Sequence, residues 1–219
     1  SITNTEEKEA DAPVDPEVAK YKRGINVKYL LQVMLFYGLA TYLVLIVTFN
    51  LPFLMEEYHF SSGNSGIMIS LFFLAIMLPG LAVDRVIALL GKKTMFVSLL
   101  LIGAGLLLLY LMKSEFFVAL GCFATGLGYG VIQPVVYNKA VVTASRERTT
   151  LALALVMSVN YLAILLCPFI VDMFAGLFRS SSSADFPFLL NALLTLIATV
   201  PCYRYRDGFV FGMTDSDFE

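Results

Sequence analysis

The stretch GLAVDRVIALLGKK, residues 80–93, sets an acid, three bases and two glycines between two long apolar segments. Its setting follows from composition, because 58% of the 219 residues are hydrophobic and only 15% are charged. These values lie outside the range of ordinary soluble domains. We infer an integral membrane protein, in which this charged stretch is a loop between two membrane spans.

Six apolar segments are each near or above the roughly 20 residues with which a helix crosses a bilayer. They run over about residues 27–55, 65–83, 94–112, 116–143, 150–178 and 186–203. Helices are expected because unpaired backbone groups cannot face lipid, and the segments lack the alternation of barrel strands. The sequence therefore predicts an all-α integral membrane protein whose six transmembrane helices form a domain over residues 24–206.

The two ends of the chain are polar. Residues 1–23 are acidic, contain proline and lack apolar periodicity, which predicts a cytoplasmic linker or tail and does not fit a signal peptide. Residues 207–219 are predicted to be a cytoplasmic C-terminal tail. Since the chain starts at Ser1 and lacks an initiator Met, a processed product and a piece of a longer protein both stay open.

Lysine and arginine gather on one side of the predicted membrane domain. That side has Lys20, Lys22, Arg23, Lys28, Arg85, Lys92, Lys93, Arg146, Arg148, Arg204 and Arg206, whereas the other side has Lys113 and Arg179. Cytoplasmic loops carry the excess of positive charge. We therefore expect both termini in the cytoplasm.

Several classes of function are disfavoured. The formal net charge of −2 and the lack of a basic patch argue against nucleic-acid binding. Cys122, Cys167 and Cys202 lie in apolar segments without metal-ligand spacing. No Ser/His pairing or ligand cluster lies among the spans, so we expect neither an enzyme nor a bound metal or cofactor.

Two motifs carry a resemblance to a known family. Gly80-x-x-x-Asp84-Arg85 followed by Gly91-Lys92-Lys93 resembles the signature loop of the major facilitator superfamily of secondary transporters. The loop departs from the usual form by four residues, 87–90, placed before the second glycine. Four residues are about one helical turn, so a helical link would return the basic pair to nearly the same face.

The fourth span carries the second motif. Residues 125–134, TGLGYGVIQP, with the basic link from Arg146 to Arg148, are similar to the glycine-rich fourth helix of either half of these transporters. Cys122 stands where many members have an arginine, and the acidic tail is similar to the linker between the halves. The chain thus resembles the C-terminal six-helix half, built as two three-helix inverted repeats.

The resemblance implies a secondary active transporter that moves a small molecule by alternating access. Proton-coupled drug or metabolite efflux is the commonest role among bacterial relatives with this loop, which implies the bacterial inner (plasma) membrane. The implied partners are a small-molecule substrate, membrane lipids and a second six-helix half, either an N-terminal half or a copy of this chain. A non-transporting six-helix module that assembles with partner subunits stays open as the alternative.

Asp84 is the most informative residue of the loop. Positive-inside topology accounts for the bases, but it gives no reason for an acid there. The bases can pair with Asp84, with Glu147 or with anionic lipid headgroups. The resemblance implies a latch that holds helices together in the outward-facing state, formed by Gly80, Asp84, Arg85, Gly91, Lys92 and Lys93.

Polar residues inside spans are costly and are therefore candidates for the transport pathway. The cavity candidates are Tyr37, Thr41 and Thr48 on the first span, Tyr129, Gln133 and Tyr137 on the fourth, and Asn160 on the fifth. Their aromatic and amide character favours an uncharged or amphipathic substrate. Candidates for helix packing or bending are Pro52, Gly126, Gly130 and Pro134.

Overall fold

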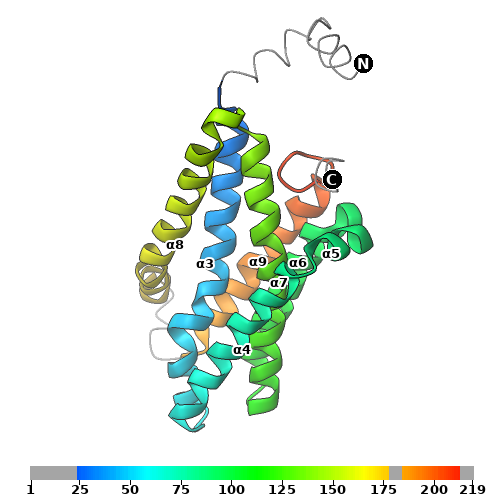
Figure 1. The fold of residues 1–219 in the computed structure, drawn as a ribbon. Coiled ribbons are helices and arrows are strands. Elements are labelled where there is room, and N and C mark those ends of the chain that lie inside the picture. Colours follow the sequence, from blue (N-terminus) through cyan, green and yellow to red (C-terminus); the bar gives the residue numbers. More distant parts are fainter. Residues whose placement is uncertain (1–23, 178–183, 213–219) are drawn as a thin grey trace, which may run out of the picture.

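The structure is a computed structural model that describes residues 24–177 and 184–212 (Figure 1). Its helices are α3 (Val27–Glu57), α4 (Ser62–Gly80), α5 (Val83–Leu90), α6 (Thr94–Leu111), α7 (Glu115–Val142), α8 (Thr149–Leu177) and α9 (Phe186–Arg204). Within the described residues, six helices are long and apolar enough to cross a membrane, which confirms the six predicted spans. The predicted linker over residues 1–23 lies outside the described part.

The charged loop is itself helical. After α4 ends at Gly80, the short helix α5 covers residues 83–90 and a single 3₁₀ turn covers Gly91–Lys93 before α6 begins. Gly91 ends α5 with a φ of 51°, a conformation that glycine adopts without steric cost. The four additional residues therefore form the last turn of a helix that brings the basic pair back toward the bundle.

The long helices fall into two sets of three with matching environments. In the most apolar 18-residue window, 61% of α3 and 56% of α7 are buried, against 22% for both α4 and α8. The contacts between the two sets, α3–α4–α6 and α7–α8–α9, are also matched. The second helix of each set packs on the first helix of the other, because α4 packs on α7 and α8 packs on α3. This is the arrangement of two three-helix inverted repeats, with α3 and α7 side by side in the middle (Figure 1).

Glycines on α7 bring its backbone against two neighbouring helices. A Cβ added to Gly130 would lie 2.9 Å from the Cα of Ile76 on α4. One added to Gly128 would lie 2.5 Å from the backbone carbonyl oxygen of Ser98 on α6. Gly126 faces α4 in the same way as Gly130. The alternating glycines therefore serve two contacts, and α7 runs on as one helix through Pro134.

The chain turns back after α9. Residues 205–212 fold back onto α3 at the basic end of the bundle. The centroids of the Phe209 and Tyr29 rings are 4.6 Å apart, and the Phe211 ring meets the Phe36 ring edge-on with centroids 5.3 Å apart. Lys139, only 2% exposed, donates a hydrogen bond from Nζ to the Gly212 carbonyl at 2.5 Å. The segment predicted as a tail from residue 207 thus begins as part of the packed bundle, and residues 213–219 lie outside the described part. We call residues 205–212 the fold-back segment.

Candidate functional site

Three helices meet at a polar triad in which Thr41 and Tyr129 are buried and Asn160 is half-buried. Thr41 of α3 donates from Oγ1 to Asn160 Oδ1 of α8 at 2.9 Å, and its oxygen lies 2.8 Å from the Tyr129 hydroxyl of α7. Tyr129 also lies 3.3 Å from the same Asn160 oxygen. In a membrane interior such groups must be satisfied by one another, so the triad ties α3, α7 and α8 together and holds its donors and acceptors in place.

Tyrosines extend the triad toward the basic end. The Tyr37 hydroxyl lies 3.0 Å from that of Tyr137, which accepts a hydrogen bond from Gln133 Nε2 at 3.3 Å. The Tyr37 and Tyr129 rings are parallel, with centroids 6.2 Å apart. The result is one connected surface of phenol, hydroxyl and amide groups on α3, α7 and α8.

This surface opens into a cavity of about 230 Å³. Its lining residues are Tyr37, Thr41, Val44, Leu45, Phe72, Phe73, Ile76, Tyr129, Gln133, Asn160 and Ile164, none of which is an acid or a base. Small-molecule sites usually occupy about 300–1,000 Å³. The chain therefore lines a space smaller than a typical complete site, with walls from α3, α4, α7 and α8. We call it the polar cavity.

The cavity candidates from the sequence come together except for Thr48. Tyr37, Thr41, Tyr129, Gln133 and Asn160 line the polar cavity, and Tyr137 is bonded to two of them. The Thr48 hydroxyl is instead buried and has no hydrogen-bond partner among the described residues. Thr48 lies two turns beyond Thr41, and the lining of the polar cavity on α3 ends before it, at Leu45.

Sequence reasoning missed the fourth wall of the cavity. Phe72, Phe73 and Ile76 come from the second half of α4, residues 71–80, which has no polar residue to mark its inner face. The sequence did contain one steric signal for this wall. Gly126 and Gly130 on α7 lack side chains at the positions where the backbone of α4 packs, next to Phe72 and Ile76.

One loop residue, Lys92, is held by an acid other than Asp84 and Glu147, the two acids considered from the sequence. Lys92 donates from Nζ to Asp207 Oδ1 of the fold-back segment at 2.7 Å. This hydrogen bond lowers the pKa of the exposed Asp207 carboxyl. Asp84 is exposed beside Pro134 and Asn138 of α7, and no ion pair joins it to any described residue.

The remaining loop residues are open to their surroundings. Arg85 and Lys93 are exposed, and a Cβ added to Gly80 would meet nothing within 4 Å. In the described part of the chain, no group of three His, Cys, Asp or Glu side chains is placed to hold a metal ion. The chemistry that the site can offer is thus hydrogen bonding and aromatic contact.

Comparison with known proteins gives one match. The family model of the Major Facilitator Superfamily matches residues 30–210, which cover all six long helices and most of the fold-back segment. No curated protein and no solved structure matches the chain. The matched region has the six spans, the paired triplets and the helical loop described above. The chain therefore belongs to the major facilitator superfamily of transporters, and its helices form one six-helix half of that fold.

Proposed function

We propose that this chain forms half of a secondary transporter that carries an uncharged or amphipathic small molecule by alternating access. The observation that carries the proposal is the polar triad of Thr41, Tyr129 and Asn160 at the wall of a cavity between the first helices of the two repeats. Polar side chains within a membrane span cost free energy, and for this reason they commonly mark substrate pathways. In transporters built from repeats, the substrate binds near mid-membrane at the repeat interface.

The chemistry of the cavity wall supports an uncharged substrate. An anion or a cation would need a buried opposite charge to replace its hydration. The wall offers only phenol, hydroxyl and amide groups with aromatic faces. A coupling carboxylate is not among these groups, so we assign proton coupling, if it operates, to the partner half.

The partner follows from the faces that this half leaves open. The helices α4 and α8 have the lowest buried fraction, and both flank the polar cavity. A second six-helix half on this face would complete the cavity and cover them. We propose an N-terminal half or a second copy of this chain for that role, in a bacterial inner membrane with both termini in the cytoplasm.

We further propose that the charged loop acts as a latch in the transport cycle. Asp84 lies in the first turn of α5, beside the α7 residues Pro134 and Asn138. A carboxylate at this position can accept hydrogen bonds from a neighbouring helix N-terminus of the partner half in one state and release them in the other. Lys92 is paired with Asp207 of this same half, so we do not assign it a contact with the partner half.

Transport in proteoliposomes tests the proposal. Vesicles with an imposed proton gradient would be assayed for uptake of two isotope-labelled uncharged probes, the amphipathic chloramphenicol and the sugar lactose. We expect Thr41→Val to raise the KM for the transported probe, because it removes the hydroxyl that holds Tyr129 and Asn160. Thr195→Val is the matched control, since this buried hydroxyl bonds only within α9.

Equal KM values for the two variants would contradict the placement of the substrate at the triad. Uptake of neither probe by the chain alone or by the chain with its partner half would favour the non-transporting module. Reading the gene upstream of Ser1 shows which partner half to use in the assay.

A further inference from the structure

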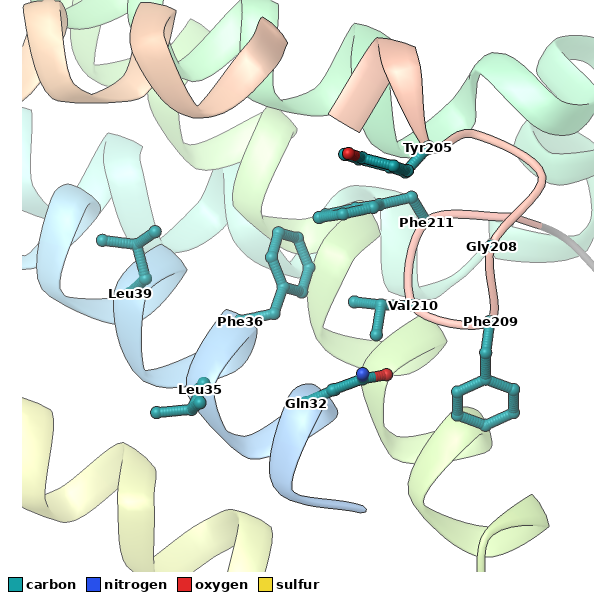
Figure 2. A pocket seen from close by; sticks show the side chains of 9 residues that line it. All are labelled: Gln32, Leu35, Phe36, Leu39, Tyr205, Gly208, Phe209, Val210 and Phe211. Carbon is teal, nitrogen blue, oxygen red and sulfur yellow. The ribbon is translucent and has the colours of Figure 1, made fainter. Parts of the chain in front are cut away.

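A second cavity lies between α3 and the fold-back segment (Figure 2). Its volume is about 520 Å³, and it shares no lining residue with the polar cavity. One wall is the face of α3 that carries Gln32, Leu35 and Leu39, and the other consists of residues from Tyr205 to Phe211. The volume is in the range of about 300–1,000 Å³ that ligand sites occupy.

The α3 wall changes character along its length. Lys28, Gln32, Leu35 and Leu39 are spaced by four, three and four residues, so they form one stripe on the helix. Lys28 lies in the first turn at the basic end, followed by the amide and then by leucines that are 65% and 42% exposed. A phospholipid presents its groups in the same order with increasing depth: phosphate, ester and acyl chain.

Among the described residues, the charge near this cavity is positive. Asp207 is the only carboxylate of residues 205–212, and it is engaged by Lys92 at 2.7 Å and by Arg206 at 4.0 Å. No described residue forms an ion pair with Lys28. Lys28 lies one helical turn before the lining residue Gln32, and among the described residues no acid that lacks a basic partner lies on the opposite wall, which favours an anionic headgroup.

We propose that this cavity binds one anionic phospholipid from the leaflet at the basic end of the bundle. Its headgroup pairs with Lys28, its ester region lies near Gln32, and one acyl chain runs between Leu35, Leu39 and the fold-back segment. The lipid thereby fills the space that separates the fold-back segment from the outer face of α3.

The absence of tryptophan from the sequence provides the probe. The full chain with Leu39→Trp has a single tryptophan at the apolar end of the cavity, and Leu193→Trp has a single tryptophan on an exposed face of α9, with wild-type leucine exposures of 42% and 48%. Both would be placed in dioleoylphosphatidylcholine vesicles in which brominated phosphatidylglycerol or brominated phosphatidylcholine replaces a rising fraction of the lipid. Bromine quenches only a tryptophan that its lipid touches.

We expect Leu39→Trp to reach half-maximal quenching at about a fivefold lower fraction of phosphatidylglycerol than of phosphatidylcholine, the preference that one lysine contributes near anionic lipid. Leu193→Trp should respond equally to both lipids. Adding Lys28→Gln should remove the preference, Lys28→Arg should keep it, and the exposed control Arg148→Gln should leave it unchanged.

Two results would overturn the proposal. Equal quenching of Leu39→Trp by both lipids would reduce the cavity to ordinary lipid contact. No quenching by either lipid would mean that protein, either residues 213–219 or a second copy, covers the cavity. Helix content measured by circular dichroism confirms that each variant is folded before quenching is compared.

Discussion

Replacing Gly130 by alanine tests the tight contact between α4 and α7. The new Cβ would lie 2.9 Å from both the carbonyl carbon and the Cα of Ile76, and closer still to its carbonyl oxygen. These are backbone atoms, so no side-chain rotation relieves the overlap and α4 must move as a unit. Overpacking of this kind typically costs about 1–3 kcal/mol.

The control is Gly103→Ala on α6. The three atoms nearest to a Cβ there are side-chain atoms of Thr195 and Leu196 on α9, at 3.4 Å or more, which is ordinary contact. Both substitutions gain the same ~1 kcal/mol of helix propensity, so the difference between the two isolates the overlap. We expect Gly130→Ala to be less stable than Gly103→Ala by about 1–3 kcal/mol.

The assay is unfolding of each variant from mixed micelles by sodium dodecyl sulfate, followed by the helical circular dichroism signal. Because Ile76 also lines the polar cavity, the displacement of α4 should lower transport by Gly130→Ala as well. Equal free energies of unfolding for the two variants would refute the view that α7 is packed backbone to backbone on α4.

Three further predictions concern the basic end of the bundle, two of them read by the emission of a single tryptophan introduced by Phe211→Trp. Lys139→Met removes the hydrogen bond to the end of the fold-back segment, so the emission should shift to longer wavelength; an unchanged spectrum would mean that the bond does not hold the segment. Asp207 has a pKa lowered from 3.8 by Lys92, so its stabilising contribution is present above that value and is lost as the pH falls through the lowered pKa. The emission should therefore be constant from about pH 7 to pH 5 and shift only below about pH 4, a dependence that Lys92→Gln should abolish. Asp84→Asn should lower transport and redistribute inward- and outward-facing states in a functional assembly, and an unchanged distribution would contradict the latch.

The spans and the polar surface could be predicted because a membrane leaves the chain few choices. Backbone groups must be paired within each segment, so long apolar runs become helices, and costly groups such as Thr41 and Asn160 must find each other. Thr48 has the same chemistry and similar spacing, yet it does not join them. Spacing places a residue on a face of its helix but does not say how far along the helix the neighbouring helix stays close.

Two features could not be read from the sequence because their signals are long-range. The partner of Lys92 is 115 residues away, on a short segment that follows the last span and whose apolar residues, Phe209 to Phe211, are too few to predict a packed element. The inner face of α4 is equally hidden, since residues 71–80, which include its cavity-lining side chains, are apolar on every face and give no direction. In both cases packing against distant helices decides the structure, and local pattern does not.

The glycine contacts of α7 also divide the bundle into a stiff and a compliant side. On the stiff side, the backbones of α4 and α6 press on that of α7, so a displacement of one passes to the others without being absorbed by rotamers. The pseudo-equivalent contact of α3 with α8 is different, because a Cβ added to Gly38 would meet a side-chain atom, Val159 Cγ1 at 2.8 Å, and no backbone atom of α8 within 4 Å. A mechanical load on this half should therefore move α4, α6 and α7 together as one rigid unit, whereas α8 is joined to α3 through side-chain contacts such as the Thr41–Asn160 hydrogen bond.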